Sequence, residues 1–218
     1  MEEKSIPWAR VAAFVRQHTH DVRNDLNSLD LETELLRDLV TDLEATTSIQ
    51  SMQKQLRSVA MQLRTLASLF HEVQPMLEPT EARSLLTLWR EKHSAMPKAP
   101  EVKWVDELGD QEVNVDVTMC TKVLQELLTN AAAFSPGAPL TITAKVEGND
   151  AIFEMVEPKK APVDPSGWGQ PLNTSRHGSY GMGLFAAHRA MAANGAEFTQ
   201  SYDAENGTLV SRIALGVI

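Results

Sequence analysis

Residues 15–43 read VRQHTHDVRNDLNSLDLETELLRDLVTDL, and the apolar side chains in this stretch have the spacing of a long amphipathic helix. One set recurs every seven residues, as a core position of a heptad does: Val15, Val22, Leu29, Leu36 and Leu43. Leu26 and Val40 fill the neighbouring seam position. The pattern therefore predicts a helix that packs against other helices along one apolar seam.

His20 lies two residues before the core position Val22, which predicts that its side chain faces solvent. Asn24 and Asn27 follow about one and two turns later on the same face. A polar stripe of one histidine and two asparagines beside an apolar seam suits a nucleophile better than a packing residue. A solvated surface histidine without a function is the alternative interpretation.

Residues 48–73, SIQSMQKQLRSVAMQLRTLASLFHEV, predict a second helix of the same kind. Its apolar residues alternate three and four positions apart: Ile49, Met52, Leu56, Val59, Leu63, Leu66, Phe70 and Val73. The join around Thr46–Ser48 is short, so we expect an antiparallel hairpin. Because a lone hairpin cannot cover both seams, we expect two hairpins to form a four-helix bundle in a homodimer.

The remainder of the chain has a different pattern. Prolines at 75, 79, 97 and 100 flank one helical segment near residues 80–93, and short strands alternate with helices from about residue 101. We expect an α+β fold in which an α/β sandwich, with helices on one face of a mixed sheet, follows the hairpin. The expected domains are residues 1–76 and 77–218.

Composition restricts the partners and the compartment. Twenty Lys and Arg against 29 Asp and Glu give a net charge of −9, which disfavours binding to nucleic acid or an anionic membrane surface. No apolar run is long enough for a membrane span, so we expect a cytoplasmic protein. Cys120, the single cysteine, is expected to be a buried thiol of a helix.

Several motifs in the order of the chain resemble the core of a bacterial two-component histidine kinase, a phosphoacceptor hairpin followed by a GHKL-type ATP-binding domain. The first motif is an exposed histidine followed by an acidic residue and, one turn on, an amide: His20, Asp21 and Asn24. The resemblance implies that His20 carries the phosphoryl group, while Asp21 orients the imidazole or accepts its proton and Asn24 positions a water or phosphoryl oxygen.

Two further motifs are similar to the nucleotide-binding boxes of that family. Residues 125–136, QELLTNAAAFSP, contain Glu126 and Asn130 on one helix face, which implies that both approach the magnesium ion of a nucleotide, with Asn130 as its ligand. In HGSYGMGL, residues 177–184, Gly181 and Gly183 would let the backbone approach phosphate. WGQPLNTS, from Trp168, is similar to an aromatic-and-proline box in the family's lid, or is a plain loop.

One motif departs from the family. After the strand AIFEMV the family has Asp-x-Gly-x-Gly, whose carboxylate reads the adenine amino group, whereas this chain has EPKKAP at residues 157–162. Glu157 could imitate the aspartate, but Pro158 and Lys159 put a fixed backbone and a side chain where glycines belong. We therefore expect weak or absent nucleotide affinity, and ATP and magnesium are open rather than certain cofactors.

Three functions remain open at this point. The first is phosphotransfer through His20 to or from aspartyl receiver domains of response regulators, with the degenerate domain docking partners. The second is an active ATP-dependent sensor histidine kinase, and the third is a catalytically silent dimeric scaffold. A separate sensor protein is a further candidate partner, because no sensor segment precedes Trp8.

Overall fold

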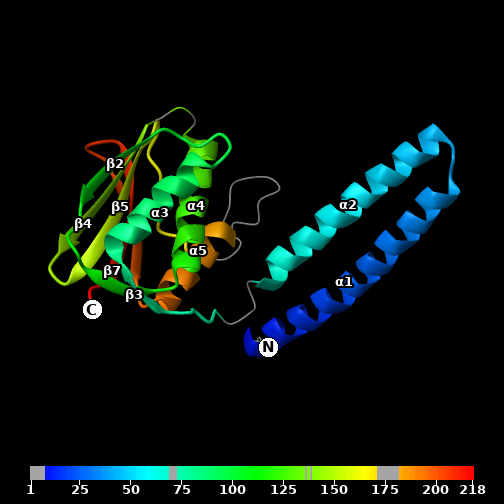
Figure 1. Ribbon diagram of the computed structural model, residues 1–218, viewed down its shortest axis with the longest axis horizontal. Helices are drawn as coiled ribbons and strands as arrows, with labels where there is room; N and C mark the ends of the chain where they lie inside the picture. The colour runs from blue at the N-terminus through cyan, green and yellow to red at the C-terminus, as the bar shows by residue number, and fades with distance from the viewer. Residues whose placement is uncertain (1–7, 69–72, 136, 138, 171–181) are drawn as a thin grey trace, which may run out of the picture. The chain divides into compact units, whose positions relative to one another are not determined.

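The computed structural model describes residues 8–68, 73–135, 137, 139–170 and 182–218. The chain forms two compact units, Met1–Glu72 and Val73–Ile218, which Figure 1 shows as a helical hairpin and a layered domain. The sequence places the boundary slightly later, between residues 76 and 77. The backbone N–H of Met76 donates to Asp116 Oδ2 at 3.0 Å, so this stretch is attached to the second unit.

The first unit consists of α1 (Trp8–Leu39) and α2 (Leu43–Ser68), joined by residues 40–42. The predicted join at Thr46–Ser48 is wrong, because these residues lie inside α2. Asp42 explains the earlier start: its Oδ2 accepts from the backbone N–H of Ala45 at 2.8 Å, as a residue at a helix N-terminus does. The Thr46 and Thr47 hydroxyls donate to carbonyl oxygens four residues back, which accommodates them in the helix.

On each helix the hairpin buries one of the two rows that the sequence marks: on α1 the row that contains Leu26, and on α2 the row that contains Ile49. Buried side chains between them include Ala12, Thr19 and Thr33 of α1 and Ile49, Gln53 and Ala67 of α2. Leu29 and Leu36, which we predicted as core positions, are 45% and 48% exposed within one chain, because small Ala and Thr side chains allow the closer approach. Among the described residues, no helix is long and apolar enough to cross a membrane.

The second unit is built on a five-stranded mixed sheet. Its strands lie in the order β2-β4-β5-β7-β6, where β2 pairs with β4 in parallel and the other neighbours are antiparallel. Their bounds are β2 Val102–Glu107, β4 Leu140–Glu147, β5 Asp150–Pro158, β6 Glu197–Asp203 and β7 Thr208–Gly216. β4 and β5 form the expected hairpin, and Gly148 in its turn has φ 62°, a conformation that favours glycine.

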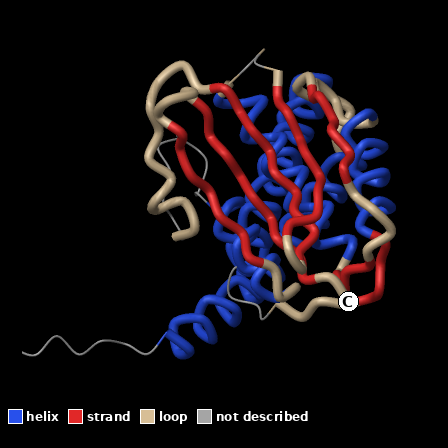
Figure 2. The backbone as a smooth tube through the Cα atoms, turned by 90° about the vertical axis from the view of Figure 1, so that its left-hand side faces the viewer, coloured by secondary structure: helices blue, strands red, loops and turns tan. Residues whose placement is uncertain are grey.

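Three helices cover one face of this sheet: α3 (Ala82–Ser94), α4 (Val117–Phe134) and α5 (Met182–Ala193) (Figure 2). The core lies between the two layers. Trp89 of α3 is 1% exposed and contacts Phe153 of β5, with ring centroids 4.9 Å apart. The apolar side of α4, with Leu124 and Leu128, is buried in the same cluster. The α+β fold expected from the sequence is confirmed.

A second, two-stranded sheet was not predicted. β1 (Glu78–Glu81) pairs antiparallel with β3 (Glu112–Val115), with Glu78 opposite Val115 and Glu81 opposite Glu112. The residues of β1 are EPTE, a polar segment with a proline, which carries no alternation of apolar side chains. Because the pairing joins segments about thirty residues apart, only the folded domain reveals this strand.

Candidate functional site

His20 lies on α1, where it is expected from the heptad pattern to face solvent, and its side chain is 64% exposed. Thr19, the preceding residue, is 3% exposed and packs inside the hairpin, with its hydroxyl bonded to the Val15 carbonyl oxygen at 2.7 Å. This anchoring of the neighbouring residue holds the helical backbone under His20, so the imidazole projects from a rigid element.

The His20 ring is contacted on one nitrogen by both polar neighbours. Asp21 Oδ1 and Asn24 Nδ2 each lie 3.4 Å from Nδ1, while Gln17 Nε2 donates to Asp21 Oδ1 at 2.9 Å. The two contacts suit opposite tautomers: a carboxylate accepts a proton from Nδ1–H, whereas an amide N–H donates to a bare Nδ1. When Nδ1 carries the proton beside Asp21, the lone pair is on Nε2, the other ring nitrogen.

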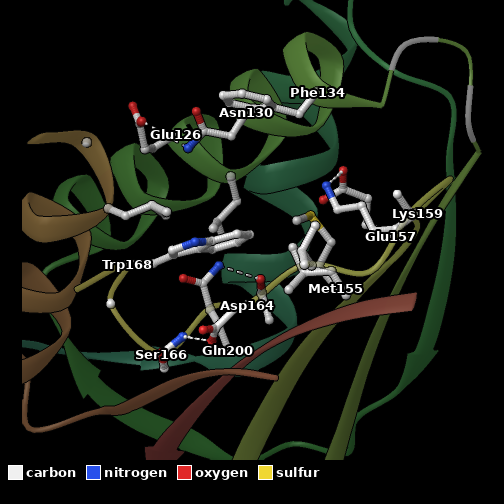
Figure 3. Close-up of a pocket in the computed structure, with 18 of the residues that line it drawn as sticks. Glu126, Asn130, Phe134, Met155, Glu157, Lys159, Asp164, Ser166, Trp168 and Gln200 are labelled. Atoms are coloured by element: carbon white, nitrogen blue, oxygen red, sulfur yellow. Dashed lines mark hydrogen bonds and ion pairs between the residues drawn. The ribbon is translucent and has the colours of Figure 1, made fainter. Parts of the chain in front are cut away.

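The second unit contains a pocket of about 710 Å³ between α4, α5 and the ends of β5 and β7 (Figure 3). Four of the residues that the resemblance implies for nucleotide binding line it: Glu126, Asn130, Glu157 and Gly183. Trp168 points into the same pocket, as the interpretation of a lid box requires. Gly181 lies outside the described residues, as does the part of that box from residue 171 onward.

Glu126 and Asn130 lie one helical turn apart on α4, and Asn130 Nδ2 donates to Glu126 Oε1 at 3.1 Å. Glu126 also contacts the start of α5. A Cβ atom on Gly183 would lie 1.7 Å from Glu126 Oε1, so this position accommodates no side chain while the carboxylate is there. The glycine therefore lies against the movable end of the Glu126 side chain, which a larger residue would displace.

Glu157 lies near the end of β5, in the pocket wall, and forms an ion pair with Lys159. The two side chains are 3% and 8% exposed, and Lys159 Nζ also donates to Ser135 Oγ at 3.2 Å. Figure 3 shows the two charged groups pointing toward one another at one end of the pocket. The carboxylate is thus already bonded to a donor of the protein itself.

These residues do not fit an adenine nucleotide in the way that the resemblance requires. The acceptor meant for the adenine amino group is engaged by an ammonium group, and Glu126 is placed against Gly183 rather than toward an ion. Within the described parts of the chain, no group of three or more His, Cys, Asp or Glu side chains could hold a metal ion. Glu126 and Asn130 would supply two oxygens to magnesium.

The ion pair is the feature that sequence reasoning missed. We treated Lys159 only as a bulky substitute for glycine, although the spacing of Glu157 and Lys159 contained a signal. Residues two apart on an extended chain point to the same side, so a carboxylate and an ammonium at this spacing can meet. Ser135, at the end of α4, could not be found in this way because it is distant in the sequence.

No family model matches the sequence, and no curated protein is similar to it. Solved structures are similar in fold. Full-length ShkA in complex with AMPPNP matches with a TM-score of 0.69 and 15% identity over 94% of this chain. The matched part is 46% of the ShkA chain, so this protein spans about half the length of that kinase.

Two other solved structures are also similar in fold to this chain. The histidine kinase AdeS of Acinetobacter baumannii matches with a TM-score of 0.54 and 17% identity over 90% of this chain and 97% of its own. The catalytic domain of histidine kinase ThkA matches with a TM-score of 0.50 and 17% identity over 64% of this chain and 95% of its own. The chain therefore has the fold of these histidine kinases, a helical hairpin followed by an α/β sandwich.

Proposed function

We propose that this protein is a histidine phosphotransferase of two-component signalling, which passes a phosphoryl group through His20 to or from aspartyl receiver domains. The observation that carries the proposal is the exposed His20 ring, whose contacts with Asp21 and Asn24 are both made by Nδ1. This arrangement leaves Nε2 available to a partner that docks on the hairpin.

The transfer needs one bond to form and one to break. Nε2 of His20 attacks the phosphorus of a phosphoaspartate in line with the leaving oxygen, the N–P bond forms, and the P–O bond to the aspartyl carboxylate breaks. The aspartate departs as a carboxylate and takes no proton. The imidazole that has gained the phosphoryl group carries positive charge, which the Asp21 carboxylate stabilises through Nδ1–H. The reverse sequence of steps phosphorylates a second receiver.

The neighbouring polar residues act through the ring. Gln17 donates to Asp21, which holds the carboxylate beside His20. Asn24 Nδ2 lies near Nδ1 and can donate to a phosphoryl oxygen when it turns outward. We propose that Asp21 selects the tautomer and that Asn24 binds the transferred group or a water. Receiver partners would place the protein in the cytoplasm, where a separate sensor protein could supply the first phosphoryl group.

Phosphotransfer is favoured over autophosphorylation by the state of the nucleotide-type pocket. Transfer between an aspartate and a histidine requires only the His20 group and a docking surface. A kinase also requires a base-reading carboxylate, and Glu157 is paired with Lys159. We propose that the second unit serves as a docking domain.

An ATP-dependent kinase is the second candidate, and two observations favour it. The pocket is large enough for a nucleotide, and Glu126, Asn130 and Gly183 are among the residues that line it. ShkA, which has a similar fold, is in complex with AMPPNP. A silent dimeric scaffold is the third candidate, but it leaves the cluster around His20 without a purpose.

Two measurements on the full chain distinguish these functions. In the first, receiver domains are phosphorylated with labelled acetyl phosphate, freed of the donor and mixed with the protein. We expect label on the protein in an acid-labile, base-stable form, as phosphohistidine is. In the second, the protein is titrated with magnesium and ATP. Because an unmet polar contact costs about 1–3 kcal/mol, we expect affinity about 5- to 150-fold weaker than that of an intact site.

The outcomes separate cleanly. Rapid self-phosphorylation with submicromolar ATP affinity would establish the kinase instead. Failure to accept label from any receiver domain, together with no ATP binding, would favour the scaffold.

A further inference from the structure

Lys159 and Glu157 form an ion pair in a place where an ion pair is expensive. Both side chains are more than nine-tenths buried, and burying two charges costs desolvation free energy that only close mutual contact and further hydrogen bonds offset. The ammonium has both, since it donates to Glu157 and to Ser135 Oγ. Lysine is rarely buried so completely without a partner. A pair of this kind therefore calls for an explanation.

The position of the pair suggests one. Glu157 stands where the resembling family has the carboxylate that reads an amino group of the bound base. A lysine ammonium and an exocyclic amino group offer the same contact, an N–H that donates to a carboxylate oxygen. The two side chains lie in the pocket wall, and Lys159 belongs to the segment that leads out of β5. The Lys159 backbone N–H donates to the Gly207 carbonyl oxygen at 2.8 Å, which fixes the backbone from which the side chain projects.

We propose that the Lys159 ammonium group permanently occupies the position beside the Glu157 carboxylate where the amino group of a base would bind. Its ammonium replaces the amino group of a ligand at Glu157, so the pocket is neutralised and filled at that end without any small molecule. Removing the ammonium would create a site for small primary ammonium ions, the class of ligand that can donate several N–H groups to a buried carboxylate. Lys159 is in this sense a specificity residue that excludes amino-bearing bases.

The other end of the pocket is arranged in the same way. Glu126 presents its carboxylate to Gly183, in the first turn of α5, where the family would bind phosphate. A carboxylate near a helix N-terminus interacts favourably with the helix dipole, as a phosphate does. The protein thus supplies a cation at the base end and an anion at the phosphate end.

The inference concerns the second unit only and does not depend on phosphotransfer by His20. Its consequence is that the domain keeps its fold without nucleotide. Without a hydrogen-bond donor, the Glu157 carboxylate would be a buried, uncompensated charge. Lys159 supplies that donor whether or not a ligand is bound.

The test is chemical rescue of Lys159→Ala in the full chain, followed by thermal unfolding. Breaking a buried pair from one side is strongly destabilising, so we expect Tm to fall on the order of 10 °C. Methylammonium chloride, the probe, should raise the Tm of this variant in a saturable manner. Tetramethylammonium chloride, which has the same charge but no N–H donor, should not. The wild-type protein should respond to neither salt beyond the effect of sodium chloride.

A double variant, Glu157→Gln with Lys159→Met, removes both charges and is the matched control. We expect it to unfold closer to the wild-type Tm than Lys159→Ala does, and to show no response to methylammonium. If Lys159→Ala does not fold, methylammonium or the double substitution should restore folding.

Several results would overturn the inference. They are a Lys159→Ala variant as stable as wild type, an equal response to the two ammonium salts, and failure of both rescues. None of these readouts involves phosphoryl transfer, so their failure leaves the role proposed for His20 untouched, and loss of that role leaves them unaffected.

Discussion

At the scale of single residues, His20 and His18 provide a direct contrast. Both are exposed on α1, but His18 stacks on Phe14, with ring centroids 5.7 Å apart, whereas His20 has Asp21 and Asn24 at Nδ1. The aromatic contact of His18 is a packing interaction. The contacts of His20 are both made by Nδ1, so Nε2 is the nitrogen that the proposed phosphoryl transfer would use.

We predict that His20→Ala abolishes label transfer from a phosphorylated receiver domain and leaves folding unchanged to within about 0.5 kcal/mol, since an exposed side chain contributes little packing. Asn24→Ala should change the rate of transfer or hydrolysis without removing the phosphohistidine. His18→Ala is the matched control and should accept label normally. Label that persists in His20→Ala and disappears in His18→Ala would move the site to His18.

Gly183 gives a second prediction at this scale. A methyl group at residue 183 would overlap the Glu126 carboxyl group, which ends a flexible side chain and can turn away, so Gly183→Ala should lower the free energy of unfolding by at most about 1 kcal/mol. Adding Glu126→Ala should recover most of the loss, because it removes the clashing atoms. Gly216→Ala is the control, since nothing lies within 4 Å of the Cβ it would add. Urea denaturation measures all four proteins, and equal losses in Gly183→Ala and the double variant would contradict the packing argument.

Cys120 is 1% exposed, as expected for a buried thiol, and burial together with the nearby Asp116 charge raises its pKa to about 12. We predict negligible reaction with a thiol reagent at pH 8 until the chain unfolds. Because the folded pKa lies above the unfolded one, Cys120 leaves stability unchanged below about pH 9 and lowers it as pH rises from there toward 12. Cys120→Ser should lack the thiol signal, and rapid labelling of the native protein would show that the thiol is accessible.

At the scale of elements, the turn of the hairpin depends on Asp42. Its side chain accepts from the Ala45 N–H and its carbonyl accepts from the Thr46 N–H at 3.0 Å, so one residue satisfies two amides of the first turn of α2. Both hydrogen bonds join residues close in the sequence, so this helix start does not depend on the second unit.

We predict that Asp42→Ala destabilises the start of α2 by about 1 kcal/mol, because an N-cap side chain is lost. Amide hydrogen exchange should show faster exchange at Ala45 and Thr46. Asp42→Asn keeps an acceptor at the same place and should retain most of the protection. Equal exchange in the two variants would mean that the side chain does not cap the helix.

At the scale of the whole molecule, each helix of the hairpin has two apolar rows, and the other helix buries only one of them. Ile49 is buried against α1 while Met52 and Val59 are 49% and 43% exposed, and on α1 Leu29 and Leu36 are exposed in the same way. Uncovered apolar rows on both helices, at heptad spacing, are suited to a second copy of the hairpin. This supports the homodimer expected from the sequence.

We predict that light scattering at micromolar concentration gives twice the chain mass of 24.1 kDa. Leu29→Glu combined with Leu36→Glu should shift the protein toward the monomer, because charges would be buried in the apolar row. Leu31→Glu is the control: Leu31 is 63% exposed and lies about 200° around the helix from Leu29. A strict monomer of the wild-type protein would contradict the four-helix bundle.

The sequence by itself was enough for features that depend on local geometry. A residue four positions from His20 must lie near it on any helix, so the grouping with Asn24 followed from spacing alone, whereas Asp21 was added by the resemblance to histidine kinases. The strands β4 and β5 were readable for the same reason, since alternation of side chains and a Gly-Asn-Asp turn are local signals. The nucleotide-type boxes were found because their residues adjoin one another in the chain.

The tertiary structure decided what depends on contacts between distant segments. Periodicity shows that α1 has apolar rows but not which row a partner helix takes, and close packing selected Thr19 and Thr33 over Leu29 and Leu36. The pairing of β1 with β3 has no local signature. Above all, the sequence presents Lys159 as an obstacle to nucleotide, whereas the fold, by burying it beside Glu157 and Ser135, makes it the counter-ion of the pocket. Desolvation makes that difference, because a buried charge must find a partner wherever the fold provides one.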